Sequence, residues 1–431
     1  MNLQARHQFT SVPDGLLPRK NNNSTGHQIL DVNGSRLHGE TGLAFGYDPG
    51  TMTRLLDLDP ADYALPRATR DKLLSPALIV HLDKVRENVA LILSHTGSPG
   101  RWRPHIKTTK IPAVYRELVR AGLRHFKCAT TREARVLLEV LREENVSDGD
   151  LLLAYPLRHP ALGVLGELAR TYTGTRISVL CEDPDLALTI PEELSIFIDV
   201  NPGMDRTGVP LSEPERLQAV VAAAANRFRG IHFYDGHLHG PVEQREAEIF
   251  ACYDKALELC IKLRDAGFPA EEIITSGTPA FLHALRYPGF QRTDGLTHRV
   301  SPGTVVFHDW RSERENPGLD LTPAAVLFTR VISRPRHGLA TCDAGSKSVA
   351  AEGDHACALV IGHPNLEAQT PNEEHLPLRA IEGEAPALGK ELFLVPHHVC
   401  PTVNLAEQVL VVDGERISVA EVTARAHDLT I

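Results

Sequence analysis

Compact apolar runs alternate with amphipathic segments through the middle of the chain. Runs such as LLLAYP, RISVLCED, IFIDVN and GIHFYDG are typical of strands buried in a parallel sheet. Between these runs, apolar positions recur three and four residues apart, as in the segment that begins at Thr131 and the long one that ends at Gly267. About eight strands separated by helices fit between residues 102 and 307. This order predicts an α/β fold, a (β/α)8 barrel of the TIM type.

The pattern changes beyond about residue 320, where helical periodicity gives way to short strands. Gly, Pro and Asp turns separate the runs AAVLFTRVIS, GLATCDAG, ACALVIG, LFLVPHHV and QVLVVDG, which predicts a C-terminal β-rich domain. The first residues of the chain are rich in Asn, Gly, Ser and His and offer little core of their own. We therefore expect a partly irregular N-terminal extension at 1–70, the barrel at 71–315 and the β-rich domain at 316–431.

Composition narrows the classes of function. A chain of 431 residues is too long for one ordinary core, in agreement with two domains. The net charge of −10 and the lack of a basic stripe argue against nucleic-acid binding, and no apolar run approaches the ~18 residues that span a membrane. The N-terminus lacks the apolar core of a secretion signal, and the seven cysteines are odd in number without a CxxC pair. We expect a cytoplasmic protein that binds neither nucleic acid nor membrane.

The segment RPHIKTTK, from Arg103 to Lys110, carries the first candidate chemistry. It lies between two helical patterns and is predicted to be a short buried strand that starts at Pro104 and runs into a loop. In an extended segment His105 and Lys107 face the same side. Burial would lower the pKa of the Lys107 amine, and a neutral amine is what bonds covalently to a carbonyl cofactor. The alternative is a lysine on a solvated edge, where most lysines lie.

Three segments in this order, PALIVHLDKVRENV, RPHIKTTK and FKCATTREARVLLEV, resemble the start of the D-serine dehydratase and D-threonine aldolase family. Members of this family are fold-type III pyridoxal 5'-phosphate (PLP) enzymes, related in fold to alanine racemase. The resemblance extends over roughly residues 75–431. It implies that Lys107, the lysine of R-P-H-x-K, carries PLP.

Further candidates lie at the carboxyl ends of barrel strands, where barrel enzymes place their sites. The resemblance implies that Arg206, after IFIDVN, contacts the pyridine nitrogen of PLP and that Tyr234 lies near the cofactor. An arginine at this place would leave the nitrogen unprotonated. The alternative for Arg206 is a surface pair with Asp205. Tyr155, at the end of LLLAYP, and His105 are expected to line the same pocket.

Two glycine turns follow late strands, in TSGTPAF and SPGTVVF. Such turns let backbone N–H groups and hydroxyls converge on a phosphate, which this face of a barrel commonly holds. The alternative is that they only turn the chain. Relatives often carry a tyrosine where this chain has Val305, which puts one contact to cofactor or substrate in question. The predicted phosphate-binding residues are Ser276, Gly277, Thr278, Gly303 and Thr304.

The β-rich domain offers VPHHVCPTVNL, in which His398 and Cys400 lie two apart. An extended backbone would present both side chains to one side. An imidazole and a thiolate together favour zinc over magnesium or calcium, with manganese as the second choice. The run H-x-C-P-T also resembles the metal motif of the family, which implies that water and substrate complete the shell and that His397 points away. The alternative is a buried strand cysteine, the usual role of a free thiol.

The resemblance as a whole implies a PLP- and metal-dependent lyase that acts on small D-β-hydroxy amino acids. In dehydration, as in a D-serine or D-3-hydroxyaspartate dehydratase, Lys107 removes the α-proton and the metal helps hydroxide to leave. In the alternative, a D-threonine aldolase, the β-hydroxyl is deprotonated and the Cα–Cβ bond breaks to give glycine and an aldehyde. Dehydratases of the family tend to have a cysteine at the position of Cys400 and aldolases an aspartate, which favours dehydration.

Three other interpretations stay open from the sequence. An amino-acid racemase would share the barrel, PLP and the β-rich domain, but has no need of His398 and Cys400. A non-catalytic PLP-binding protein usually lacks a second domain, and a pseudoenzyme is compatible with Val305. In this fold the β-rich domain of one subunit is expected to cover the barrel mouth of another, which predicts a homodimer with a shared active site.

Overall fold

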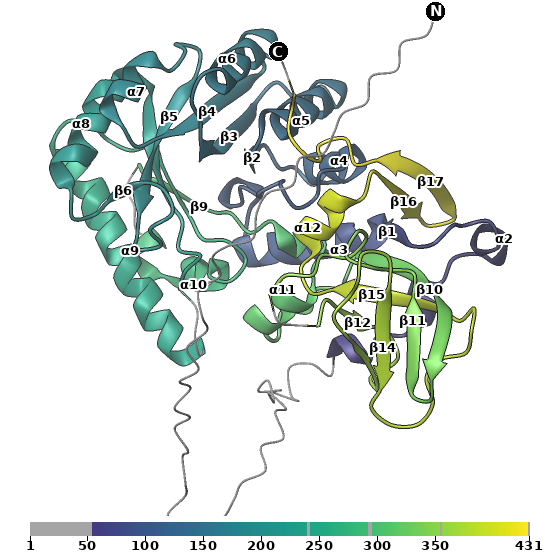
Figure 1. Cartoon of the computed structure of the whole chain (residues 1–431). Helices are drawn as coiled ribbons and strands as arrows, with labels where there is room; N and C mark the ends of the chain where they lie inside the picture. The colour runs from purple at the N-terminus through teal and green to yellow at the C-terminus, as the bar shows by residue number, and fades with distance from the viewer. Residues whose placement is uncertain (1–53, 239–241, 292–294, 354–355, 430–431) are drawn as a thin grey trace, which may run out of the picture. The chain divides into compact units, whose positions relative to one another are not determined.

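The computed structural model describes residues 54–238, 242–291, 295–353 and 356–429 (Figure 1). Most of the expected N-terminal extension lies outside these ranges. Its described part contains a 3-10 turn at Pro60–Tyr63 and the short helix α2 at Arg67–Arg70. Tyr63 is fully buried in a hydrophobic cluster of the β-rich domain. The end of the extension therefore packs as part of the folded body.

Seven parallel strands within the described residues form a curled sheet in the order β2-β3-β4-β5-β7-β8-β9, and helices cover its outer face (Figure 1). Most of these strands are the apolar runs recognised in the sequence, as expected for strands buried on both faces. The strands are β2 His125–Cys128, β3 Gly149–Pro156, β4 Thr175–Cys181, β5 Ser195–Asn201, β7 Phe228–Phe233, β8 Glu272–Thr275 and β9 Thr297–Val300, and the short β6 Val209–Pro210 pairs with β5. Helix α4, Pro112–Arg120, precedes β2, and the helices between the strands are α5 Thr131–Glu143, α6 Ala161–Thr171, α7 Pro184–Thr189, α8 Pro214–Ala224, α9 Val242–Asp265 and α10 Phe281–Arg286.

The segment from Trp102 to His105 joins the two edges of this sheet. Trp102 forms an isolated parallel bridge with Val300 of β9, and His105 forms one with Lys127 of β2. The predicted strand over RPHIKTTK is wrong in its extent, because only these two bridges form and the four residues after His105 make a turn. The predicted α/β barrel is confirmed, with this short segment in place of an eighth strand.

The interior of the barrel is filled in layers, since alternate residues of each strand point inward. At the amino-terminal end Arg103 is fully buried and forms ion pairs with Asp150 and Glu272, both at 2.9 Å. These charges satisfy one another. The next layer is apolar and consists of Leu152, Leu180, Phe197 and Ile274. The next polar side chains lie at the carboxyl ends of the strands, so a catalytic site is expected there.

The β-rich domain is built on one mixed sheet in the order β13-β14-β11-β10-β1-β16-β17, with β15 beside β10 and β12 beside β15. Strand β1, Ala77–His81, precedes the barrel in sequence, yet it pairs antiparallel with β10 and parallel with β16. The chain therefore enters the barrel from this sheet through α3 and returns to it after α11. The bounds are α3 Leu82–Thr96, α11 Trp310–Glu315, β10 Ala325–Arg336, β11 Leu339–Cys342, β12 Ala358–Val360, β13 Leu366–Ala368, β14 Leu376–Ala380, β15 Glu391–Pro396, β16 Gln408–Asp413 and β17 Arg416–Glu421.

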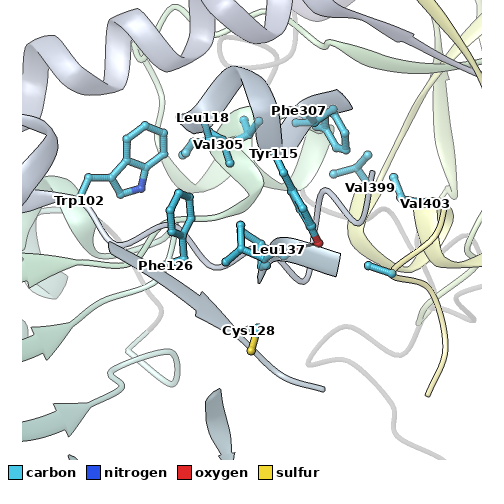
Figure 2. Close-up of a cluster of buried hydrophobic side chains, with 14 of the residues drawn as sticks. Trp102, Tyr115, Leu118, Phe126, Cys128, Leu137, Val305, Phe307, Val399 and Val403 are labelled. Carbon is cyan, nitrogen blue, oxygen red and sulfur yellow. Dashed lines mark hydrogen bonds between the residues drawn. The ribbon is translucent and has the colours of Figure 1, made fainter. Parts of the chain in front are cut away.

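One helix interrupts the β-rich domain. Helix α12, Val399–Leu405, follows β15 directly, so the expectation that helices end before this domain is wrong. Val399 and Val403 are four residues apart and share one face of the helix. Both are fully buried in the large core cluster, together with Tyr115 and Phe307 of the barrel region (Figure 2). This packing fixes the start of α12 against the barrel.

Two general expectations concern cysteines and membranes. All seven cysteines lie within the described ranges, and all are free thiols. Cys128 and Cys260 are buried in the core and act there as small apolar side chains. In the described part of the chain, no helix has the length and apolar character needed to cross a membrane.

Candidate active site

A cavity of about 510 Å³ lies at the carboxyl ends of the barrel strands, against the start of α12. A volume of this order suits a cofactor or a small ligand. Both the barrel and the β-rich domain contribute to its wall. All the site residues predicted from the sequence line it except Ser276, namely His105, Lys107, Tyr155, Arg206, Tyr234, Gly277, Thr278, Gly303, Thr304, His398 and Cys400.

Lys107 lies in the turn that follows His105. Its side chain is exposed in the cavity rather than buried. The prediction that burial desolvates this amine is wrong, because the strand that was expected to carry it inward is a turn. The amine is instead accessible to a small molecule that enters the cavity.

The desolvated amine of the site belongs to Lys127 on β2, which is 2% exposed and lines the cavity. Burial and, next, the charge of Lys107 lower the pKa of Lys127 to about 7. Its Nζ lies 3.4 Å from Nε2 of His232, whose Nδ1 lies 2.8 Å from Oδ1 of Asp199. Burial and the charge of Lys127 keep the pKa of His232 below its ordinary value, so the ring is neutral at neutral pH. Asp199 then accepts the Nδ1–H proton, which leaves Nε2 as an acceptor for Lys127.

Tyr234 and Arg206 form one side of the cavity. The guanidinium of Arg206 lies 4.8 Å from the centre of the Tyr234 ring, a cation–π contact. A Cβ added at Gly236 would lie 2.3 Å from this ring, and one at Gly277 would lie 3.1 Å from it. Glycine at both positions therefore makes room for the phenol ring at the wall. Asp205, the alternative partner for the arginine, accepts a hydrogen bond from a neighbouring asparagine side chain.

The two glycine turns are joined, since the N–H of Ser301 donates to the carbonyl of Ser276 at 3.2 Å. The hydroxyl of Ser301 is buried and has no hydrogen-bond partner among the described residues, and Ser301 lines the cavity. A buried hydroxyl that lacks a partner suits an anion bound beside the turn of Gly303 and Thr304. A Cβ at Gly303 would lie 2.3 Å from the carbonyl oxygen of His105, so this close approach requires glycine.

Two positions singled out from the sequence do not line the cavity. Ser276 is fully buried in a left-handed conformation, with a φ of 54°, and does not reach the cavity wall. Val305, where relatives often have tyrosine, is fully buried in the hydrophobic cluster of Figure 2. The aliphatic side chain therefore serves the core, while the preceding Thr304 faces the cavity.

His398 and Cys400 meet at the start of α12. His398 is the N-cap residue and Cys400 lies in the first turn, so the pair is not presented by an extended strand as predicted. Burial opposes ionisation of Cys400, but the hydrogen bond with His398 and its charge outweigh burial and lower the pKa of the thiol. Burial also acts to lower the pKa of His398, but the contacts with Cys400 and Glu352 raise it to about 9.

The two side chains are oriented by their neighbours. Nδ1 of His398 lies 2.6 Å from Oε2 of Glu352, which leaves Nε2 available to a metal. Oγ1 of Thr108 lies 3.1 Å from Sγ of Cys400. No group of three or more His, Cys, Asp and Glu side chains with metal-binding geometry occurs among the described residues. A metal on this pair would therefore have open positions for water and substrate.

Asp309 holds α12 in place. Its fully buried carboxylate caps α11 by accepting the N–H of Ser312 at 2.8 Å and accepts the N–H of Val399 at the same distance. His397, which was expected to point away from the metal, packs edge-to-face on Trp310, with 5.4 Å between the ring centres. The backbone that carries the pair is thus fixed from both sides.

Sequence reasoning missed Lys127, Asp199 and His232. Each lies in an apolar strand run, in HFKC, IFID and GIHF respectively. A polar residue in a strand buried on both faces needs a polar partner inside the protein. Three such residues in three strands of one predicted barrel were therefore a signal that they meet at its centre.

Models of two families match the two parts of the chain. Residues 80–309 match the alanine racemase N-terminal domain, and residues 324–412 match the putative serine dehydratase domain. D-threonine aldolase from an Arthrobacter species is 28% identical over 344 residues, which cover 75% of this chain and 85% of that protein. 3-hydroxy-D-aspartate aldolase from Paracoccus denitrificans (strain Pd 1222) is 27% identical over 385 residues, which cover 84% and 95%.

Solved structures share this fold. D-threonine aldolase from Filomicrobium marinum superposes with a TM-score of 0.71 at 25% identity, covering 82% of this chain and 96% of that one. D-threo-3-hydroxyaspartate dehydratase from Delftia sp. HT23 superposes with a TM-score of 0.67 at 22% identity, covering 83% and 99%. A variant of a D-threo-3-hydroxyaspartate dehydratase in which alanine replaces a cysteine was solved in the metal-free form.

Proposed function

This chain belongs to the alanine racemase N-terminal domain family, and on that premise we propose that it is a PLP- and metal-dependent lyase acting on D-β-hydroxy amino acids. The observation that carries the proposal is the meeting of two unlike sets of residues in one cavity. Lys107 comes from the barrel, and His398 and Cys400 come from the β-rich domain. A racemase has a use for the lysine but none for the metal-binding pair. The names of the relatives, aldolases and a dehydratase of β-hydroxy amino acids, support the same substrate class.

PLP held by Lys107 would supply an electron sink for charge that develops beside the substrate's amino group. The residues present fit this cofactor. Lys107 offers an accessible amine, and Tyr234 offers an aromatic face with Arg206 beside it. The unpartnered Ser301 hydroxyl and the Gly303 turn suit its phosphate.

A divalent metal would be held by Nε2 of His398 and Sγ of Cys400. Zinc fits this donor set best and manganese is the second choice, because the thiolate is a soft ligand. The lowered pKa of Cys400 favours the thiolate, which is the form that binds metals. A metal held at this place would supply a Lewis acid for the substrate's β-hydroxyl. The metal-free dehydratase variant supports a role for a cysteine in metal binding within this fold.

Dehydration to an oxo acid and ammonia is the reaction that we favour. Cys400 stands where dehydratases of the family tend to have cysteine and aldolases tend to have aspartate. An amine of the cavity would take the α-proton, and a metal held by His398 and Cys400 would assist departure of the β-hydroxyl. Retro-aldol cleavage is the second candidate, and the names of the Arthrobacter and Paracoccus relatives favour it.

We propose that the protein is a cytoplasmic homodimer, which the resemblance to the family and the composition support. His398, Cys400 and Lys107 of one chain already line the same cavity. A second subunit is therefore not needed to bring the metal ligands to the cofactor lysine, in contrast to the expected active site shared between subunits. A second subunit would instead complete the outer wall of the cavity.

Incubation with D-serine, D-threonine and D-3-hydroxyaspartate tests the function. Oxo acid with ammonia indicates dehydration, and glycine with an aldehyde indicates cleavage. The L-enantiomers and a Lys107→Ala variant serve as controls and should give no product. Racemisation of D-alanine in chelator-treated protein, with no turnover of any β-hydroxy substrate, would instead identify a racemase.

A further inference from the structure

Lys127 is a buried amine that neither the cofactor site nor the metal site uses. We propose that Lys127 is a second acid–base residue, which exchanges a proton with Cα of the bound substrate; this rests on the lyase function proposed above. In dehydration its neutral Nζ takes the proton from Cα, the C–H electron pair forms a Cα=Cβ double bond, and the Cβ–O bond breaks to release the oxygen as hydroxide. In cleavage its ammonium form gives a proton to Cα, which completes glycine.

The geometry holds the Lys127 amine at the cavity wall. Nζ donates to Nε2 of His232 at 3.4 Å, and His232 is fixed in turn by Asp199 at 2.8 Å. Because Asp199 fixes the tautomer of the imidazole, His232 keeps an acceptor directed at Nζ. This contact uses only one hydrogen-bonding position of the Lys127 amine, so its other positions remain available to the substrate.

Lys110 shows what a structural lysine looks like in this chain. It is also buried, at 7% exposed, but its Nζ forms an ion pair with Glu133 at 2.6 Å. In the described part of the chain Lys127 forms no ion pair with a carboxylate and instead lines the cavity. A buried amine with no counter-ion is costly for the fold. Lys127 therefore has the properties of a functional residue.

The surroundings of Lys127 allow both of its protonation states. Burial and nearby positive charges disfavour the ammonium, and Asp235 favours it, which places the pKa at about 7. An acid–base residue works best when its pKa lies near the working pH. Nζ contacts His232, which is held in turn by Asp199, and lies 5.8 Å from the centre of the Tyr234 ring. The charges that act on Lys127 are those of Lys107, Asp235, Arg103 and Arg206, and the charge of Lys127 acts on His105.

Exchange of the α-hydrogen in D2O isolates this step from chemistry at Cβ. Glycine or D-alanine is incubated with the PLP-loaded protein, and loss of the α-hydrogen signal is followed by NMR. In Lys127→Met and Lys127→Arg the rate should fall about 100-fold or more, while the visible absorbance of lysine-bound PLP remains. Arginine keeps the charge but cannot release its proton. The wild-type rate should rise as the pH passes through about 7, and this rise should be absent in both variants.

Stability of the cofactor-free protein gives a readout that does not depend on turnover. The folded-state pKa of Lys127 lies below its ordinary value, so the unfolded chain binds the extra proton. The resulting destabilisation is fully present below about pH 7 and fades as the pH approaches the ordinary lysine pKa of about 10.4. The melting temperature of Lys127→Met relative to wild type should therefore be highest at low pH and should decline as pH rises. Lys110→Met, the matched control, should lower the melting temperature because it leaves Glu133 buried without its partner.

The outcomes separate this inference from the proposed function. Wild-type exchange rates in PLP-loaded Lys127→Met or Lys127→Arg would overturn the role of Lys127 and leave the lyase proposal intact. Absence of PLP binding and of all β-hydroxy turnover in the wild type would overturn both. His232→Gln offers a second variant; it should slow exchange less than Lys127→Met does, because it removes the positioning acceptor and not the proton carrier.

Discussion

Thr108 and Cys400 are 292 positions apart in the sequence, yet their side-chain oxygen and sulfur lie 3.1 Å apart. Thr108 directly follows Lys107, and Cys400 lies in the first turn of α12. Thr304, from the second glycine turn, approaches the same sulfur at 3.5 Å. The Thr108–Cys400 contact therefore joins the proposed metal ligand to the residue next to the proposed cofactor lysine. A metal and a cofactor held at these places would act on adjacent atoms of one small substrate.

Borohydride reduction of the PLP-loaded protein should fix the cofactor on Lys107, because that amine is exposed in the cavity. Peptide mapping by mass spectrometry locates the label. Lys107→Ala should lose the visible absorbance of lysine-bound PLP, while Lys127→Met should keep it. Label on Lys127 or Lys110 in the wild-type protein would contradict the assignment.

Glu352→Gln should weaken metal binding by roughly 10–100-fold, the usual cost of losing a partner that orients a ligand. The carboxylate of Glu352 holds Nδ1 of His398 at 2.6 Å and thereby directs Nε2 toward the metal. Metal affinity is measured by competition with a chromophoric chelator. Glu415→Gln, on an exposed glutamate in the turn between β16 and β17, is the control and should leave the affinity unchanged. Equal affinity in both variants would remove Glu352 from the site.

Gly303→Ala should both destabilise the protein and weaken PLP binding. The new Cβ would lie 2.3 Å from the carbonyl oxygen of His105, so the backbone beside Lys107 must move. Overpacking of this kind costs about 1–3 kcal/mol. Gly163→Ala in α6 is the matched control, because its Cβ meets nothing within 4 Å and alanine favours helix by about 0.5–1 kcal/mol. Urea unfolding and PLP titration of both variants check the prediction, which fails if Gly303→Ala behaves like the control.

Local pattern was enough to predict the barrel strands and the proposed site motifs, because each depends on residues close in sequence. The environments of individual side chains depend on distant neighbours. The run PALIVHL has the same pattern whichever sheet it joins, and β1 in fact pairs with β10 and β16. The pocket around Lys127 is built by strands β2, β5 and β7, so only the assembled barrel shows that this lysine, and not Lys107, is desolvated.

Helix α12 is a second feature that depends on residues distant in sequence and that local pattern therefore did not predict. The run LFLVPHHV is apolar enough to continue as a strand, and the pattern alone does not show where β15 ends. The structure ends the strand at Pro396 and begins a helix at Val399, whose side chain packs into the barrel core. Asp309, which lies 90 positions earlier, accepts the N–H of Val399 and stabilises this start. The spacing of His398 and Cys400 thus correctly placed both side chains at one site, but the extended strand from which we argued is in fact the start of a helix.

Cys400→Ala should remove the metal and lyase activity together while PLP binding persists, because the cofactor residues lie on the barrel. Metal content is measured by elemental analysis and PLP by absorbance. In the wild type, metal affinity should fall as the pH is lowered, since protons compete for the thiolate and the imidazole. Cys260→Ala, on a buried cysteine of α9 that does not line the cavity, controls for loss of a core thiol. Full turnover after exhaustive chelation would end the metal proposal.

Cys400→Asp tests whether the identity of the ligand steers the reaction. The change keeps an anionic ligand in the first turn of α12 but replaces a soft sulfur with a hard oxygen, which should shift metal preference from zinc toward manganese or magnesium. A hard metal site binds an alkoxide oxygen well, which favours deprotonation of the β-hydroxyl over its departure, so the ratio of glycine to oxo acid formed from D-threonine should rise. Both products are quantified in the same reaction with each metal supplied in turn. Cys400→Ser, which offers a neutral oxygen, is the control and should bind metal poorly without a change in product ratio. If Cys400→Asp binds manganese and yet gives the wild-type ratio of products, ligand identity does not choose between dehydration and cleavage, and the reason for favouring dehydration in this chain is lost.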